Sequence, residues 1–465
     1  MIGCDIGVLF KVTVAGGSYQ DGNTTHIQGI PPGVRITEEQ IYSDLLLRKP
    51  GQDELTSPRR EPDIPIIYSG INAADTMPGF SNKGLTNGTP MVILIPNMDR
   101  HFEHIDAYQK TNRTPRPGHA SYASYQKYGE CDDAIGAGIF SGRYTCTIVA
   151  AGVVAKEILK RHGIEVTGYI REAAGVRAQD MSIEAIRERV TAFRTMRKKH
   201  DPVYDIIFGQ GRIRPEMRLL EKMAVLAEFE PQIPELYARG KNMDEQTIRK
   251  EYGVHPKLNC PDLEAADEMY RRIMEITKDG DSSGGLVEVV ATGLPAGMGE
   301  PVFRKLDGEL GKMMSIAAVK AIEIGDGFKV KDMRGSECND QMYGEEVGAD
   351  LCVCPDKQET EDRINGKRGC VSNNKEVCFK SNHAGGIVGG LTTGQPIVVS
   401  LAVKPTPTIG KPQSTIDKIT HETMILDAVT RRDPTIVPRV WPVAEAFVSI
   451  ILLDYYMQHR AYQGM

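Results

Sequence analysis

The most restrictive feature of this sequence is the separation of its strand-like and helix-like segments along the chain. Apolar residues alternate over 397–403 as in a strand with one buried face, and a short strand is also predicted over 91–95. Between them, apolar residues spaced by three and four from Ile183 to Phe193 predict an amphipathic helix, and Asp262 is a suitable cap for another. The 465 residues are therefore expected to form strand-rich first and last parts around a helical middle, as two or three domains or as one large domain with insertions.

Charge and composition restrict the possible partners. The formal net charge is −6, whereas proteins that bind nucleic acid carry a basic excess, so we expect no nucleic-acid partner. The first residues lack the basic and apolar parts of a secretory signal, and Glu445 and Asp454 interrupt the apolar stretch 443–456, so we expect no membrane segment. Nine cysteines, an odd number, argue against a disulfide framework. These features predict a cytoplasmic globular protein.

Two glycine-rich stretches are candidates for ligand contact. The stretch 136–142 precedes a predicted helix over 149–161, where backbone N–H groups suit an anion, although its glycine spacing differs from the dinucleotide-binding pattern. The stretch 381–390 leads into the strand before Lys404 and Thr408, and adjacent glycines let a flat ring approach the backbone. Taken alone, each stretch also fits an ordinary glycine-rich turn.

Two loops and one cysteine-bearing segment complete the candidates. His119 follows a Pro-Gly turn, and Asp433 precedes a proline in an arginine-rich loop, which are positions where side chains are often functional. The segment at about 341–380 carries four thiols, but their spacing does not match the paired C-x-x-C pattern of a zinc site. We therefore expect a polar surface loop and no metal, with zinc as the alternative, at Cys352, Cys354, Cys370 and Cys378.

Several motifs resemble those of the chorismate synthase family, both in their residues and in their order along the chain. The resemblance covers 1–180 and 260–465, and so many motifs in one order are specific for membership, as a divergent member or paralogue. The matching segments are GVLFKVT (7–13), RREPD (59–63), RPGHA (116–120), QKYG (126–129), VAAGVVAK (149–156), GEPVF (299–303), MSIAAVK (314–320), EIGDGF (323–328), MRGSE (333–337), AGGIVGG (384–390), KPTPTI (404–409) and DPxxVPR (433–439).

The resemblance implies an α+β fold, a β-α-β sandwich, in which 181–259 is a helical insertion lobe between the two parts of the core. It implies a homotetramer or homodimer that holds reduced FMN. The family's reaction is a lyase reaction, the anti-1,4-elimination of phosphate from 5-enolpyruvylshikimate 3-phosphate to give chorismate in aromatic amino acid biosynthesis, without net redox change. The flavin N5 and a nearby Asp are thought to take the ring proton.

The resemblance also implies roles for individual residues. His119 is the flavin-side histidine and Asp433 the carboxylate beside the flavin. The expected flavin contacts are Ser141, Asn382, Ala384, Lys404 and Thr408. The expected substrate contacts are Ser18, Arg48, Arg143 and Arg431.

The sequence departs from the family's pattern at positions that carry charge. The family's G-E-S-H-G places a histidine where this chain has Tyr19, and two arginine positions are Leu47 and Glu54. Each charge-assisted contact contributes roughly 1.5–3 kcal/mol, so such losses predict weak or absent turnover of the phosphosubstrate. The alternatives are a paralogue acting on a less anionic cyclic substrate and a non-catalytic flavin-binding protein.

Overall fold

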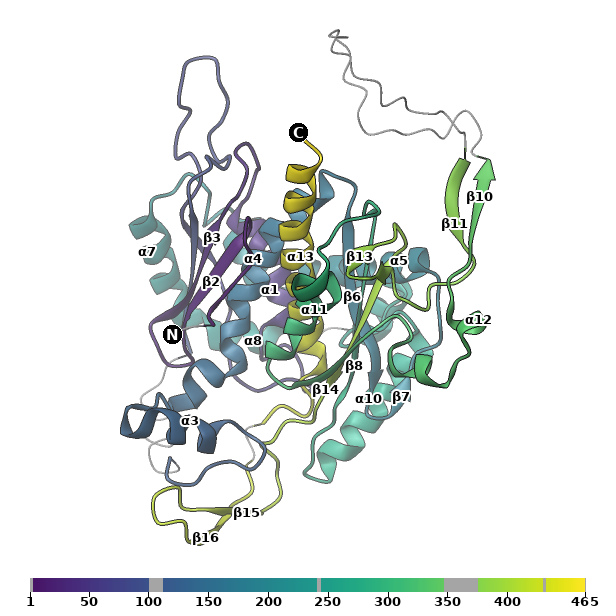
Figure 1. Ribbon diagram of the computed structural model, residues 1–465. Helices are drawn as coiled ribbons and strands as arrows, with labels where there is room; N and C mark the ends of the chain where they lie inside the picture. The colour runs from purple at the N-terminus through teal and green to yellow at the C-terminus, as the bar shows by residue number, and fades with distance from the viewer. Residues whose placement is uncertain (1–2, 100–111, 241–243, 347–374, 430–431, 465) are drawn as a thin grey trace.

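The computed structural model describes residues 3–99, 112–240, 244–346, 375–429 and 432–464, and shows two antiparallel sheets enclosing a layer of helices (Figure 1). This α+β sandwich is the architecture that the sequence predicted. The first sheet has five strands in the order β1 (Asp5–Ile6), β2 (Lys11–Gly16), β3 (Gly22–Gln28), β5 (Met91–Pro96) and β4 (Ile66–Ser69).

The second sheet follows the same plan with later parts of the chain. Along β14, Ile397, Val399, Leu401 and Val403 are all buried, as their alternation predicted. Its order is β7 (Val176–Arg177), β6 (Glu165–Ala173), β8 (Gly285–Thr292), β14 (Ile397–Val403) and β9 (Val319–Ile324). Three two-stranded ribbons are β10 (Met342–Glu346) with β11 (Lys375–Phe379), β12 (Ile387–Val388) with β13 (Leu391–Thr392), and β15 (Gln413–Ile416) with β16 (Thr423–Leu426).

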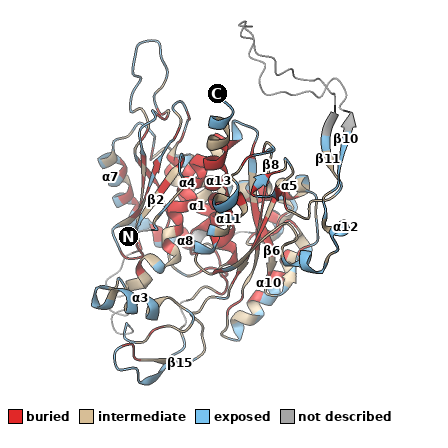
Figure 2. Ribbon diagram, in the orientation of Figure 1, coloured by how far each residue is buried: buried red, intermediate tan, exposed pale blue. Residues whose placement is uncertain are grey.

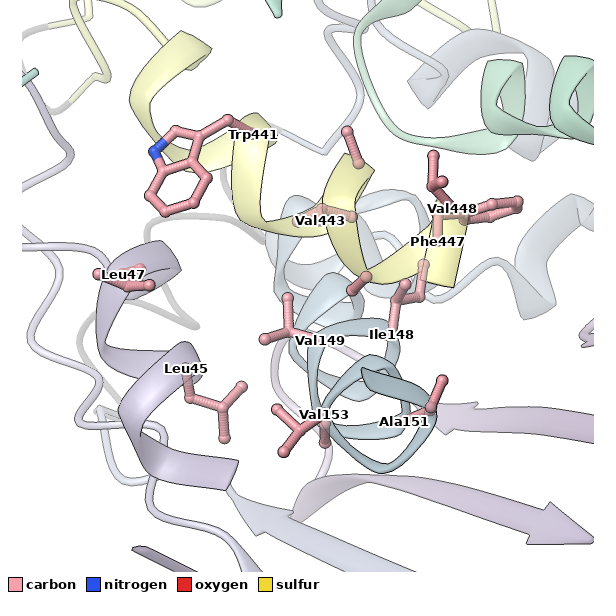
Figure 3. Packing of buried hydrophobic residues seen from close by; sticks show 14 of the residues in the cluster. Leu45, Leu47, Ile148, Val149, Ala151, Val153, Trp441, Val443, Phe447 and Val448 are labelled. Atoms are coloured by element: carbon pink, nitrogen blue, oxygen red, sulfur yellow. The ribbon is translucent and has the colours of Figure 1, made fainter. Parts of the chain in front are cut away.

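Three helices form the layer between the sheets: α1 (Glu38–Arg48), α4 (Thr145–Lys160) and α13 (Val437–Tyr462). Figure 2 shows the buried residues concentrated on them. Helix α4 contacts the first sheet and α13 the second, and the two helices pack closely, because a Cβ at Gly152 would lie 2.3 Å from Cβ of Ala446. Figure 3 shows the apolar contacts, with Val149 of α4 between Leu45 and Val443. This layer fixes the distance between the two sheets.

The central helices are apolar on most sides because both flanks are covered. By length and composition α13 resembles a membrane span, but 89% of its most apolar part is buried in the protein, as in the core helix of a soluble protein. It begins at Val437, because Pro438 occupies its first turn, where a missing N–H costs nothing. Helix α4 begins four residues before its predicted start.

Helices dominate the segment 181–259. They are α5 (Ile183–Lys199), α6 (Pro202–Tyr204), α7 (Leu219–Phe229), α8 (Ile233–Gly240) and α9 (Glu245–Tyr252), and α10 (Leu263–Lys278) follows with Asp262 as its cap. Buried ion pairs join this segment to the central helices: Lys222 with Glu38, Asp201 with Lys49, and Arg194 with Glu445. The segment therefore shares the main core; its status as an inserted domain stays a prediction.

We expect deletion of residues 184–255 to give insoluble protein. The deletion would expose the apolar side of α1 and leave Glu38 and Lys49 as buried charges without their ionic partners, and each broken buried pair costs about 3–5 kcal/mol. The measurement is the soluble fraction and far-ultraviolet circular dichroism after expression. A soluble, cooperatively unfolding deletion protein would show that the segment is an independent lobe.

The cysteine-bearing segment lies mostly outside the described residues. Cys352, Cys354 and Cys370 lie there, and Cys378 is on β11. Among the described residues no group of three potential metal ligands occurs. The remaining short helices are α3 (Ser121–Tyr128), α11 (Leu306–Leu310) and α12 (Gly335–Cys338).

Candidate active site

One large cavity brings together loops from both parts of the core. Its volume is about 1400 Å³, more than the roughly 300–1,000 Å³ of a site for a single small ligand, so it has room for two. The predicted residues that line it are Tyr19, His119, Ser141, Arg143, Lys404, Thr408 and Asp433. These residues span more than 400 positions in sequence, and the meeting of the two sheets around α4 and α13 places them together.

Other predicted contacts lie elsewhere. Ser18 and Arg48 are fully buried behind the cavity wall, where the Arg48 guanidinium pairs with Asp63 at 3.3 Å. Asn382 and Ala384 do not line the cavity: the Asn382 amide donates to the carbonyl of Pro396, and the Ala384 N–H donates to the carboxylate of Asp340. Both are thus occupied in holding the second glycine-rich loop. Arg431 lies outside the described residues.

The first glycine-rich stretch forms part of the cavity wall. Gly136 and Gly138 have φ values of +58° and +49°, which disfavour side chains. A Cβ at Gly136 would lie 2.5 Å from the ring of Tyr19, and one at Gly138 would lie 2.4 Å from the carbonyl oxygen of Asp133. Close backbone approach, rather than a helix dipole, therefore explains these glycines. Ser141 accepts the Arg143 N–H at 3.3 Å and caps the turn before α4.

His119 is held in a neutral form. Burial, followed by the charges of Arg116 and Lys404, lowers its pKa to about 4. Nδ1 of His119 accepts the Ser121 N–H at 3.1 Å, and a guanidinium nitrogen of Arg116 lies 3.3 Å from Nε2. In the protein alone Arg116 and Lys404 therefore carry the positive charge of this region, and the His119 ring is neutral.

The Asp433 carboxylate is held by one of its two oxygens. Oδ1 accepts the Ser57 N–H at 2.8 Å and a guanidinium N–H of Arg439 at 3.1 Å, while Oδ2 accepts no hydrogen bond in the described part of the chain. Arg432, the neighbour of Asp433 in sequence, donates to backbone carbonyls instead, whereas the first turn of α13 brings Arg439 to the carboxylate.

Lys404 is a cation without an anionic partner. Its Nζ donates to the carbonyl of Gly118, and within the described ranges it forms no ion pair. Beside it, the Thr408 hydroxyl accepts from Arg116 at 3.3 Å. This corner of the cavity is therefore suited to an anionic group on a ligand.

Arg143 lines the cavity but is committed to a buried charged cluster. Its Nε donates to Asn97 at 2.7 Å, and its terminal nitrogens pair with Asp63 and with Glu61 at 3.4 Å. Arg48 completes the cluster through Asp63. With its N–H groups used inside the protein, Arg143 has a structural role that sequence reasoning did not predict.

Comparison with known proteins identifies the family. The family model described as chorismate synthase matches residues 10–457. The chain belongs to the chorismate synthase family. It is 34% identical to the chorismate synthase of Acetivibrio thermocellus over 480 aligned residues, covering all of this chain and 97% of that protein. It is also 34% identical to that of Methanosarcina acetivorans, covering 98% of this chain and 97% of that protein.

A solved structure supports the fold. A crystal structure of a chorismate synthase aligns with a TM-score of 0.58 and 22% identity, covering 98% of this chain and 93% of that one. The match shows the same sandwich, and the two relatives of comparable length extend through the helical segment 181–259. Enzymes of the chorismate synthase family are lyases.

Among the departures from the chorismate synthase pattern, Tyr19 lines the cavity and two replaced arginine positions do not. Leu47 packs in the core, and Glu54 pairs with Lys257 at 2.6 Å; neither lines the cavity. Four described carboxylates line it, all aspartates, against eight basic side chains, of which Arg59, Arg143 and Arg439 pair with carboxylates of the protein. Several of these basic side chains were not predicted as site residues from the sequence. Three of them are nevertheless in the RREPD, RPGHA and DPxxVPR motifs: Arg59, Arg116 and Arg439.

Proposed function

We propose that this chain is a reduced-FMN-dependent lyase that converts 5-enolpyruvylshikimate 3-phosphate to chorismate. One observation carries the proposal: neutral His119 and the singly held carboxylate of Asp433 line one cationic cavity with room for a cofactor and a substrate. The excess of basic side chains suits a substrate with two carboxylates and a phosphate. Family membership and this charge do not favour the alternatives, a paralogue for a less anionic substrate or a non-catalytic flavin protein.

The residues present fit FMN. Lys404 provides a cation, Thr408 and Ser141 provide hydroxyl groups, and the wall near Gly118 leaves space where a side chain would otherwise lie. When bound, reduced FMN would supply electron density to the reacting ring of the substrate. These contacts are proposals drawn from the charge and geometry of the cavity.

The chain's own groups divide the remaining tasks. Oδ2 of Asp433 is available to accept a proton, because Ser57 and Arg439 engage only Oδ1. The neutral ring of His119 carries one N–H, which can donate to an anionic oxygen. In the reaction the substrate loses a ring proton and the C–O bond to phosphate breaks with its electron pair on the departing oxygen, giving the ring diene and hydrogen phosphate.

An anaerobic assay tests this proposal. The full chain, with dithionite-reduced FMN and 5-enolpyruvylshikimate 3-phosphate, should form chorismate, detected by its absorbance, with one phosphate released per turnover. The dephosphorylated analogue should give no product. Flavin binding without chorismate formation would favour the less anionic substrate, and no flavin binding in either redox state would contradict the proposal entirely.

Lys404→Met should weaken FMN binding. A charge-assisted hydrogen bond contributes about 1.5–3 kcal/mol, so Kd should rise about 10- to 100-fold. Calorimetric titration with FMN measures this change. Lys320→Met is the matched control, since Lys320 is exposed on β9 and does not line the cavity. If the two substitutions raised the Kd for FMN equally, Lys404 would not be a flavin contact.

Binding of reduced FMN should be linked to proton uptake by His119. The folded pKa of about 4 lies below the ordinary value of 6.5, so His119 is neutral at pH 7, and an anion beside it raises its pKa. The lowered pKa also means that His119 stabilises the folded state above about pH 6.5 and loses this contribution as pH falls toward 4. Calorimetry in buffers of different ionisation enthalpy should show more proton uptake at pH 6 than at pH 8, and His119→Asn should remove that difference.

We also propose a homotetramer or homodimer that acts in the cytoplasm. Support for assembly comes from exposed apolar side chains on neighbouring loops, including Phe303, which is 98% exposed, and Leu391 on the strand that bridges to Gly299. The free thiols of the described cysteines are compatible with a reducing compartment. Sedimentation velocity tests the assembly, and Phe303→Asp should shift the protein toward monomer.

A further inference from the structure

A two-stranded ribbon lies against the loop that carries His119. The ribbon, residues 413–426, consists of β15, β16 and the turn between them, and it lies at the edge of the molecule near α3 (Figure 1). Most of its side chains are exposed, Met424 and Ile425 among them, and two strands alone are marginally stable in water. Contacts with neighbouring segments must therefore hold the ribbon. Its two buried residues, Asp417 and Lys418, are both in the turn, and each is 6% exposed.

Lys418 connects the ribbon to two segments beside the cavity. Its Nζ donates to Oδ1 of Asn112 at 2.9 Å and lies 4.5 Å from the centroid of the Tyr125 ring on α3. Its backbone N–H donates to the carbonyl of Arg113 at 2.9 Å. A lysine is rarely buried unless partners replace the water around its ammonium group, and here a side-chain amide and an aromatic face do so. Asn112 lines the cavity and Lys418 does not, so Lys418 acts on the cavity only through these neighbours.

The ribbon holds the same loop at two further points. Oδ2 of Asp417 pairs with the guanidinium of Arg113 at 2.7 Å, and Oδ1 accepts two backbone N–H groups that close the turn. The Thr415 hydroxyl donates to the carbonyl of Pro115 at 2.6 Å. The chain is therefore held at 112, 113 and 115, immediately before the segment that carries His119.

That segment, 116–121, is a compact turn. The carbonyl of Arg116 accepts the His119 N–H at 3.2 Å, and the Arg116 N–H donates to the Ser121 hydroxyl at 3.0 Å. Pro115 and Pro117 fix the backbone φ on either side of Arg116, so little rotation is possible between the held residues and the turn. The position of 113 and 115 therefore sets where the His119 ring lies in the cavity.

We propose that the ribbon is a clamp on the loop 112–121 and that Lys418 is a positioning residue for His119. The clamp orders the loop before a ligand binds, so that binding does not include the cost of ordering it. In this role Lys418 needs no contact with flavin or substrate. Its expected effect on turnover rests on the proposed function, because it assumes that His119 contacts the ligands, whereas the clamp itself is a property of the protein alone.

Hydrogen–deuterium exchange of the full chain without ligands tests the clamp. In Lys418→Met, which keeps the apolar stem but removes the ammonium group, the hydrogen-bonded amides of Arg116, His119 and Ser121 should exchange about 10- to 100-fold faster, the effect of losing a hydrogen bond to a charged group. Amides of α4 and α13 should exchange as in the wild type. Lys418→Arg, which keeps a cation over Tyr125, should recover part of the protection. Ser414→Ala is the matched control, because Ser414 is an exposed residue of the same ribbon.

Two exchange results would overturn the proposal. These are unchanged exchange of the loop amides in Lys418→Met and equal acceleration by Ser414→Ala. Thr415→Val, which removes the bond to Pro115, should accelerate the same amides, and it keeps the proposal testable if Lys418→Met does not fold.

Kinetics with reduced FMN and 5-enolpyruvylshikimate 3-phosphate separate positioning from loss of folded protein. In Lys418→Met the substrate must order the opened loop when it binds, so KM should rise about 10-fold while kcat stays within about twofold of the wild type. Loss of folded enzyme would instead lower kcat at unchanged KM, and this result would also overturn the proposal. A wild type that forms no chorismate would contradict the proposed function but would leave the exchange result, and with it the clamp, unaffected.

Discussion

Asp433→Asn is expected to lower kcat for chorismate formation about 10²- to 10⁴-fold, the usual loss when a general base is removed. The amide keeps the size of the side chain and an oxygen that can accept from Ser57 and Arg439, so the loop should keep its shape. What is lost is the oxygen available to accept a proton. Single-turnover assays under anaerobic conditions measure this change, and the FMN titration should match the wild type.

Asp427→Asn is the control for this substitution. Asp427 is an exposed carboxylate in the segment that leads to Asp433, and it does not line the cavity. It should leave kcat unchanged. If Asp433→Asn retained turnover at the wild-type rate, Asp433 would have no part in proton transfer and the carboxylate would serve only to anchor Ser57 and Arg439.

Arg143→Met is expected to lower the free energy of unfolding by about 3–5 kcal/mol, since breaking a buried ion pair leaves uncompensated charge. Both carboxylates beside Arg143, Asp63 and Glu61, are fully buried. Burial raises the pKa of Asp63, but the charges of Arg143 and Arg48 outweigh burial and leave this pKa below its usual value. Urea denaturation followed by circular dichroism measures the loss.

The destabilisation caused by Arg143→Met should depend on pH. In the wild type the lowered pKa of Asp63 stabilises the folded state above the unfolded pKa, and this contribution is lost as pH falls. Without Arg143 the pKa of Asp63 rises, so the folded variant gains protons as pH falls. The destabilisation relative to the wild type should therefore shrink from pH 7 to pH 5.

Arg177→Met provides the control, because Arg177 is on the surface and its pair with Glu172 is exposed to solvent. It should change stability by less than about 1 kcal/mol. A small effect of Arg143→Met that does not vary with pH would contradict the buried cluster and return Arg143 to the role of a substrate contact.

The identity of several site residues was predictable because it depends on local sequence. The Pro-Gly turn at 117–118 presents His119, the proline after Asp433 shapes its loop, and Lys404 directly follows the last residue of β14. All three residues line the cavity. The family resemblance implied that Arg48 and Arg143 are substrate contacts, and neither the resemblance nor their charge shows which carboxylate will lie nearby.

The sequence by itself determined the local elements of this protein: the alternation along β14, the cap of α10 and the apolar helix α4 follow from side chains a few positions apart. The tertiary structure alone decided which charges are free. Asp63 lies between Arg48 and Arg143, and Arg439 rather than Arg432 reaches Asp433. Electrostatic energy depends on distance in space and on burial, and neither follows from the order of residues until two sheets have packed on one layer of helices.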